Sequence, residues 1–283
     1  MPTKIPWTDV SWNPVVGCTK VSPGCDNCYA EAITKRFHRG DFNQVALHIK
    51  RLGHPFRWRK PRKIFVCSVS DLFHSRVPFD YINKVFCVMG ANPRHIYQLL
   101  TKRPGRLAYF ANIYHPPLWD DRGTTWGAQW PSNIWAGTSV ETQKYAPRLD
   151  VLARVPAKVR FVSVEPMLEP VDLRKWLGGC ECLPYVGMAR PDKVCEDYWA
   201  NDVHEDDTCS CGGMKAEPTI NWTICGGESG PHARPMKIEW LLDLVAQCKE
   251  AGVPVFVKQD SGRLPGKQGR IPDDIWALKE FPS

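Results

Sequence analysis

Three cysteines lie close together near the start of the chain, at Cys18, Cys25 and Cys28. Pro23 and Gly24 come between them and favour a loop that turns back on itself, and residues 30–37 after Cys28 are expected to form a helix. Three thiolates on one loop can each bind one iron of a four-iron, four-sulfide cube. The spacing therefore predicts a [4Fe–4S] cluster held by these three residues.

The fourth iron of such a cube would have no protein ligand and could bind a small molecule. S-adenosylmethionine (SAM) needs an open iron of this kind, because its amino and carboxylate groups chelate the metal before an electron cleaves the sulfonium to a 5′-deoxyadenosyl radical. The cofactors supply that chemistry, and the protein positions them and excludes water. We therefore expect SAM as a second cofactor, and a reductant such as flavodoxin or ferredoxin as the electron source.

Zinc is the alternative interpretation of the triad. Three cysteines and one histidine can complete a tetrahedral zinc site, and His38 and His74 are the candidate fourth ligands. Structural zinc ligands usually come as two short pairs rather than as one triad, so the cluster is the favoured interpretation.

A second group of cysteines lies in an acidic segment, residues 178–218, which we interpret as a metal-binding insertion. Residues 180–213 carry eight acids and only two bases. Two Cys-x-Cys pairs frame this stretch, and they are Cys180, Cys182, Cys209 and Cys211. A zinc ion would stabilise a segment that is too polar to form a core. An auxiliary iron–sulfur cluster and four free thiols are the alternatives.

The rest of the sequence alternates between strand-like and helix-like patterns. Short apolar runs predict buried strands at residues 63–68, 95–100, 133–137, 159–163, 221–225 and 253–257. Helical patterns cover residues 80–89, 143–154 and 237–251, and Pro104-Gly105 is expected to form a turn. This alternation predicts an α/β fold, a full or partial TIM-like (β/α) barrel formed by residues 1–177 and 219–283.

Polar residues follow each predicted strand. They are Ser68, Ser70 and Asp71; Thr101, Lys102 and Arg103; Thr138, Ser139 and Glu141; Ser163 and Glu165; Glu228 and Ser229; and Lys258 and Gln259. Such residues are also common as helix caps. In a barrel, however, the carboxyl ends of the strands meet at one face, where active sites are built. We therefore expect the active site among these residues.

Several motifs resemble the radical SAM superfamily and, more closely, a phage- and prophage-associated family of unknown function with a three-cysteine motif. They are Thr8-Asp9-Val10-Ser11-Trp12-Asn13-Pro14, the cysteine triad, Ser70-Asp71-Leu72-Phe73-His74, Leu100-Thr101-Lys102-Arg103-Pro104, Ser163-Val164-Glu165-Pro166 and Gly226-Gly227-Glu228-Ser229-Gly230. The resemblance covers nearly the whole chain except residues 180–213. It implies a barrel-like fold, a cluster and SAM. The superfamily usually has three residues between its first two cysteines, and here there are six.

The resemblance also suggests which residues bind SAM. The superfamily binds the amino group of SAM with a Gly-Gly-Glu motif after its second strand. In this chain the same motif, residues 226–228, follows a late strand. Residues 226–228 could form a flexible turn, or a substrate-binding loop together with His232 and Arg234. We therefore assign the methionine-binding role to the residues after the second strand and the ribose to those after the fourth. The predicted cofactor-binding residues are Ser68, Ser70, Asp71, Thr138, Ser139, Glu141 and Glu165. Glu165 could instead be an ion-pair partner of Lys102 or Arg103.

The charge of the chain is unevenly distributed. The net charge is +7, and residues 35–63 hold ten Lys or Arg and a single acid. The predicted nucleic-acid-binding residues are Arg57, Arg59, Lys60, Arg62 and Lys63, with Phe37, Phe56 and Trp58 between the cations to stack on bases. Because this stretch follows the cysteine loop, we expect it near the mouth of the active site. A solvated surface is the alternative.

These observations predict an iron–sulfur radical SAM enzyme that modifies a nucleic acid or nucleotide. A metal-stabilised nucleic-acid-binding protein without catalysis is one alternative, and a radical enzyme that acts on a small metabolite is another. The sequence contains no run of apolar residues long enough to span a membrane. Its polar first residues lack the apolar core of a signal peptide, so we expect a cytoplasmic protein without a membrane partner.

Overall fold

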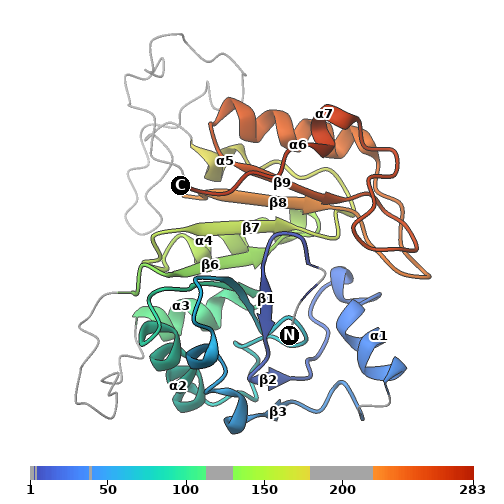
Figure 1. Ribbon diagram of the computed structural model, residues 1–283. Helices are drawn as coiled ribbons and strands as arrows, with labels where there is room; N and C mark the ends of the chain where they lie inside the picture. Colours follow the sequence, from blue (N-terminus) through green and yellow to red (C-terminus); the bar gives the residue numbers. More distant parts are fainter. Residues whose placement is uncertain (1–2, 4, 38–39, 113–129, 179–218) are drawn as a thin grey trace, which may run out of the picture.

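The computed structural model describes residues 3, 5–37, 40–112, 130–178 and 219–283. Its centre is a sheet of seven parallel strands in the order β1-β4-β5-β6-β7-β8-β9. The strands are β1 (Val10–Trp12), β4 (Lys63–Val66), β5 (Ile96–Thr101), β6 (Ile134–Ser139), β7 (Arg160–Val164), β8 (Trp222–Gly226) and β9 (Val255–Gln259). Each strand lies beside the next along the chain, and the sheet curls (Figure 1). The fold is a partial TIM-like barrel, and the α/β prediction is confirmed.

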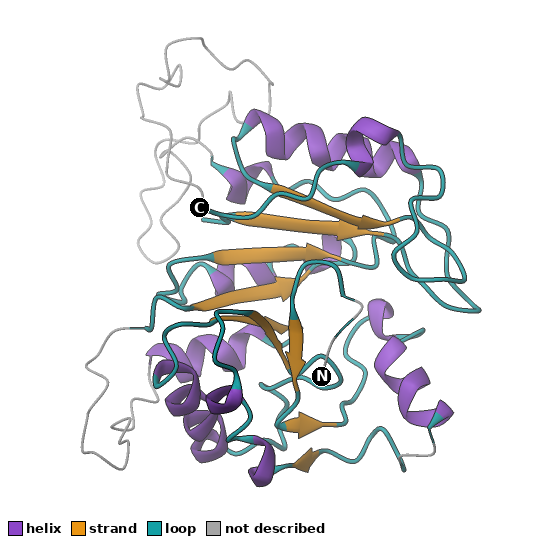
Figure 2. Ribbon diagram, viewed as in Figure 1, coloured by secondary structure: helices purple, strands orange, loops and turns teal. Residues whose placement is uncertain are grey.

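Helices cover the outer face of the sheet (Figure 2). They are α2 (Phe79–Gly90), α3 (Pro104–Asn112), α4 (Arg148–Leu152), α5 (Arg174–Leu177) and α6 (Ile238–Glu250). Their buried apolar side chains join those of the sheet in one large core, to which α2 contributes Ile82, Val85 and Met89 and α6 contributes Leu241 and Leu244. These helices thus make the outer layer of the partial barrel.

Two local predictions were wrong, each at a proline. The pattern over residues 143–154 predicts one helix, but a 3₁₀ turn (Gln143–Tyr145) precedes α4, and Pro147 separates the two. Proline lacks the N–H that a continuous helix would use there. Pro104-Gly105 begins α3 instead of forming a turn, because a proline is well tolerated in the first turn of a helix.

Aromatic side chains fill the inner face of the sheet near the starts of the strands. This second core contains Trp7, Phe65, Trp135, Val159, Phe161, Trp222, Ile224 and Phe256. The rings of Trp135 and Phe161 lie 5.8 and 5.5 Å from that of Trp222. Because side chains on one face recur every second residue, Ser139, Ser163 and Lys258 share this face nearer the carboxyl ends. The inner face is therefore apolar at one edge and polar at the other.

The chain between β1 and β4 forms a separate small unit beside the barrel. It contains the antiparallel pair β2 (Val15–Val16) and β3 (Ala46–Leu47), and one helix, α1 (Tyr29–Arg36). Three 3₁₀ turns complete it, at Pro23–Cys25, Ile49–Arg51 and Pro55–Arg57. A short helix, α7 (Asp273–Trp276), follows β9. Within the described ranges, no helix is long and apolar enough to cross a membrane.

Candidate functional site

The cysteine loop, residues 17–28, runs from β2 to α1 and lies against the carboxyl ends of the strands. The backbone N–H of Gly17 donates to the carbonyl of Val69 (3.3 Å), just after β4, and that of Cys18 donates to Phe42 (2.8 Å). Cys28 is the N-terminal capping residue of α1. Cys18, Cys25 and Cys28 are free thiols and half-buried. The loop therefore places three half-buried cysteine side chains at the edge where the sequence predicts an active site.

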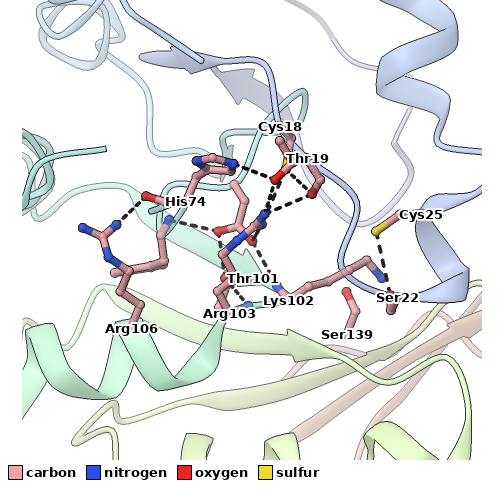
Figure 3. Close-up of polar contacts among 12 residues, drawn as sticks. Cys18, Thr19, Ser22, Cys25, His74, Thr101, Lys102, Arg103, Arg106 and Ser139 are labelled. Carbon is pink, nitrogen blue, oxygen red and sulfur yellow. Dashed lines mark hydrogen bonds and ion pairs between the residues drawn. The ribbon is translucent and has the colours of Figure 1, made fainter. Parts of the chain in front are cut away.

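The first anchor of the loop is Arg103, which follows β5. Its Nη1 lies 3.5 Å from the Cys18 sulfur, and its Nη2 donates to the carbonyl (3.0 Å) and hydroxyl (3.1 Å) oxygens of Thr19 (Figure 3). Asp71, which follows β4, accepts from Arg103 Nη1 (3.1 Å) and from the Thr101 hydroxyl (2.8 Å). Asp71 thus orients the guanidinium that holds Cys18.

The second anchor is Glu141, which follows β6 and is fully buried. Its carboxylate accepts from Ser22 (2.7 Å) and pairs with Lys102 and with Arg148 (3.0 Å). A Cβ on Gly24 would lie only 2.4 Å from Cγ of Glu141, so the loop packs directly on this side chain. The segment just before Cys25 is therefore held by a buried carboxylate between two cations.

The third anchor is Glu228, which follows β8. Its carboxylate forms a two-pronged ion pair with Arg234 (2.6 and 3.0 Å) and accepts from the side-chain amide of Asn27 (2.9 Å). Arg234 also donates to the carbonyl of Pro23 (2.9 Å) and lies 3.4 Å from Asp26. This anchor holds the loop on both sides of Cys25.

The three thiols have different electrostatic environments. Burial raises the pKa of the Cys18 thiol to about 11, and burial also raises the pKa of Cys28. At Cys25 burial is outweighed by backbone hydrogen bonds at Val21 and Ser22 and by the charge of Lys102, so the pKa is lowered. Metal binding requires thiolates, and Cys25 is the thiol that loses its proton most readily.

The donor set fits a cluster better than one zinc ion. Across the described ranges, no three His, Cys, Asp or Glu side chains gather as the ligands of one metal ion would. The thiolates of a cube each bind a different iron, so they need not converge on one point. His74 uses both ring nitrogens, since Nδ1 accepts from the Arg76 N–H (3.1 Å) and Nε2 bonds to the Thr19 hydroxyl (2.9 Å). It is not poised as a fourth zinc ligand, and His38 lies outside the described residues.

The structure brings the seven predicted cofactor-binding residues to the same edge as the cysteine loop, but most of their polar atoms have partners. Asp71 and Glu141 belong to the anchors. Ser68 donates to the side chain of Asn13 (3.2 Å), while Ser70 donates to the carbonyl of Val15 (2.7 Å). These hydrogen bonds brace the loop after β4 against the start of the chain. Binding of SAM by these residues stays a prediction.

The remaining three residues differ in their surroundings. Thr138 donates to the carbonyl of Thr101 (2.8 Å), whereas the Ser139 side chain has no partner in the described part of the chain. Glu165 pairs with Lys258 (3.2 Å) across the inner face, and not with Lys102 or Arg103. The Ser139 side chain and the Glu165–Lys258 pair therefore differ from the other predicted residues, because they neither form an anchor of the cysteine loop nor brace the backbone beside it.

The glycine-rich segment after β8 is not a loose turn. A Cβ on Gly227 would lie 2.3 Å from Oγ of Ser261, so the close approach of the segment to the loop after β9 requires glycine. The next residue is Glu228, which forms the third anchor. The described contacts thus tie this segment to the cysteine loop.

Lys35 and Arg36, at the start of the basic stretch, lie on α1 directly after the cysteine loop, but the five predicted nucleic-acid-binding residues do not lie at the mouth of the site, and for them that expectation was wrong. Lys63 is the first residue of β4, so residues 57–62 lie at the amino-terminal edge of the sheet, while the cysteine loop contacts the opposite edge. Arg57, Arg59 and Lys60 are exposed there, and Arg62 and Lys63 are half-buried. Trp58 is half-buried, packs against the core and meets the His95 ring in a T-shaped contact, with ring centroids 6.1 Å apart.

Sequence reasoning missed two partners of the anchors, Ser22 and Arg148. Ser22 meets Glu141 across 119 residues of sequence, and no local pattern in the seven residues from Glu141 to Arg148 indicates that these two side chains pair. It also missed the role of Arg103, although the motif at residues 100–104 contains it. The predicted zinc ligands Cys180, Cys182, Cys209 and Cys211 lie outside the described residues, so the zinc site stays a prediction.

Comparison with known proteins identifies a family without naming an activity. The model of the family described as "Protein of unknown function (DUF5131)" matches residues 2–271, so the chain belongs to that family. No curated protein matches the chain. Among solved structures, it is similar to a mutant of spore photoproduct lyase, with 15% sequence identity and a TM-score of 0.40. That match covers 59% of this chain and 48%, about half, of the lyase.

Proposed function

We propose that this member of a family of unknown function is an iron–sulfur radical SAM enzyme. The observation that carries the proposal is the cysteine loop, because its three free thiols are held by three anchors at the carboxyl edge of a partial parallel barrel. When bound, a [4Fe–4S] cluster would supply one electron to cleave SAM into methionine and a 5′-deoxyadenosyl radical. Cys18, Cys25 and Cys28 would hold the cluster and leave one iron open.

The residues around the loop have roles that suit this chemistry. The anchors fix the loop through buried charges, so the sulfurs need little rearrangement when metal binds. Ser139 and the Glu165–Lys258 pair lie on the inner face at the same edge as the loop, where the substrate and SAM would be received. The aromatic core below them excludes water from that side.

The metal content of the anaerobically purified protein tests this proposal. We expect about four irons and four sulfides per chain, with brown colour and visible absorption. Replacing Cys18, Cys25 or Cys28 with Ala should bleach that absorption, since each thiolate holds one iron. Cys87→Ala is the matched control, because Cys87 is half-buried on the outer helix α2. If the triple Cys variant kept its iron and sulfide, the proposal would be wrong.

Nucleic acid is the substrate class that we propose. The exposed Arg57, Arg59 and Lys60 form no ion pair within the described part of the chain, and the adjacent Phe56 ring is 50% exposed. Cations neutralise phosphates and aromatic faces stack on bases. This basic surface lies one strand length, about 15–20 Å, from the cysteine edge. A ligand that reaches both must be an oligonucleotide rather than a mononucleotide.

Salt dependence tests this part of the proposal. If three phosphates of a single strand are neutralised, the affinity should fall with a log–log slope of about −2 against salt concentration. Fluorescence anisotropy with labelled single-stranded DNA and RNA between 50 and 200 mM salt would measure it. Negligible affinity at the lowest salt would favour a small metabolite, whereas tight binding by a protein without iron would favour a non-catalytic binding protein.

A further inference from the structure

The three thiols differ in what donates to them. Among the described residues, Cys18 is the one that a cationic side chain contacts, at 3.5 Å from Arg103 Nη1. Cys25 has the weaker neighbour Ser22, whose hydroxyl lies 3.8 Å from the sulfur. The Cys28 thiol instead has backbone hydrogen bonds from the first turn of α1, at Ala30 and Glu31. Among these contacts, therefore, one sulfur has a charged hydrogen-bond donor, the Arg103 guanidinium, and the other two have neutral donors.

The position of the Arg103 guanidinium is fully determined. Nη1 donates to Asp71 as well as to Cys18, and Nη2 donates twice to Thr19. Only 14% of the Arg103 side chain is exposed. Lysine could replace the charge but not this planar set of four contacts, because its ammonium is a compact point charge on a flexible stem.

We propose that Arg103 is a positioning residue that sets the reduction potential of the cluster through Cys18. The inference rests on the proposed function. A hydrogen bond to a cluster sulfur stabilises the electron-rich state and raises the potential. In the step concerned, the cluster gains one electron from the external reductant, and no bond forms or breaks. Arg103 thus makes that transfer more favourable, and Asp71 holds it in place.

The potential of the loaded protein, measured in a dithionite titration with redox mediators and followed by electron paramagnetic resonance, tests this inference. In Arg103→Lys, the equilibrium constant for reduction should fall about tenfold, which is ~59 mV for a one-electron couple. Arg160→Lys is the matched control, because Arg160 is half-buried at the start of β7 and its guanidinium donates to the carbonyls of Thr219 (2.7 Å) and Ala157 (3.2 Å), at the edge of the sheet opposite the cysteine loop. The potential of that variant should equal the wild-type value.

A second measurement avoids any loss of folding in the variant. Wild-type protein labelled with ¹⁵N-arginine should show a coupling between a guanidinium nitrogen and the electron spin of the reduced cluster, and Arg160→Lys should keep that signal. A loaded Arg103→Lys variant with the wild-type potential, or labelled protein without the coupling, would overturn the role of Arg103. A wild-type protein that binds no iron and sulfide would instead refute the proposed function itself.

Discussion

At the carboxyl edge of the sheet, the cations Lys102, Arg103 and Arg148 each face a buried carboxylate, whereas at the amino edge Arg57 and Arg59 are exposed without an acid partner in the described ranges. Buried charges are costly unless they are paired and hydrogen-bonded. Exposed charges carry no such penalty and stay available to anions. Charge at the carboxyl edge therefore fixes the geometry of the cysteine loop, while charge at the amino edge is free to bind a partner.

The largest expected effect comes from reversing the charge of the exposed cations at the amino edge. Changing Arg57, Arg59 and Lys60 to Glu should weaken binding of single-stranded nucleic acid by at least ~100-fold at low salt, because three phosphate contacts become repulsions. Anisotropy titrations measure the change, and the iron content should stay at the wild-type level.

A matched variant separates this surface from the total charge. Changing the exposed Lys84, Arg154 and Lys249 to Glu alters the net charge equally, at sites on or beside the outer helices. We expect only a small loss of affinity in that variant. An equal loss in both variants would mean that net charge, and not the amino-edge surface, binds nucleic acid.

The next largest effect comes from removing a buried charge at the carboxyl edge. Glu141→Gln leaves Lys102 and Arg148 buried beside a neutral side chain, so the free energy of unfolding should fall by about 3 kcal/mol. Burial already lowers the pKa of Lys102 to about 8, which reflects how costly its charge is there. Urea denaturation of the metal-free protein measures the loss. Arg59→Gln at the amino edge should change stability by less than ~0.5 kcal/mol, and equal losses would contradict the comparison.

The smallest effect concerns the third anchor and depends on pH. Burial opposes ionisation of Glu228, but hydrogen bonds from Arg234 outweigh it and lower the pKa of the carboxyl. A lowered pKa means that the anchor stabilises the fold above the ordinary glutamate pKa of about 4.3 and loses that effect as the pH falls through the folded value.

Glu228→Gln tests that dependence. At pH 7 it should cost about 1–2 kcal/mol, and amide exchange should quicken in the cysteine loop. The stability difference from the wild type should shrink as the pH falls below about 4.3 and be lost once Glu228 is protonated in the folded protein. A difference that persists at such a pH would show that shape, and not charge, makes the anchor.

The strands and the triad could be predicted from local patterns, because an apolar run or a cysteine spacing is complete within a few residues. The anchors could not. Asp71 and Arg103 lie 32 residues apart, and Glu228 and Asn27 lie 201 apart. A carboxylate after a strand has the same local sequence whether it binds a ligand or a neighbouring cation. Only the order of the strands decides which cation it meets.

The misplacement of residues 57–63 has a different cause. These residues follow the cysteine loop in sequence, which suggests proximity. They also lead directly into β4, and the start and end of a strand lie at opposite edges of a sheet. The predicted strand at residues 63–68 therefore contained the information that places Arg57 to Arg62 away from the site.

The central claim is that the anchored cysteine loop supports reductive cleavage of SAM, and its most direct test is the product. The protein would be loaded with iron and sulfide under anaerobic conditions, reduced with dithionite and mixed with SAM. Our account predicts 5′-deoxyadenosine and methionine in equal amounts, and neither product from the triple Cys→Ala variant. A protein that carries a full complement of iron and sulfide and yet forms no 5′-deoxyadenosine would contradict it.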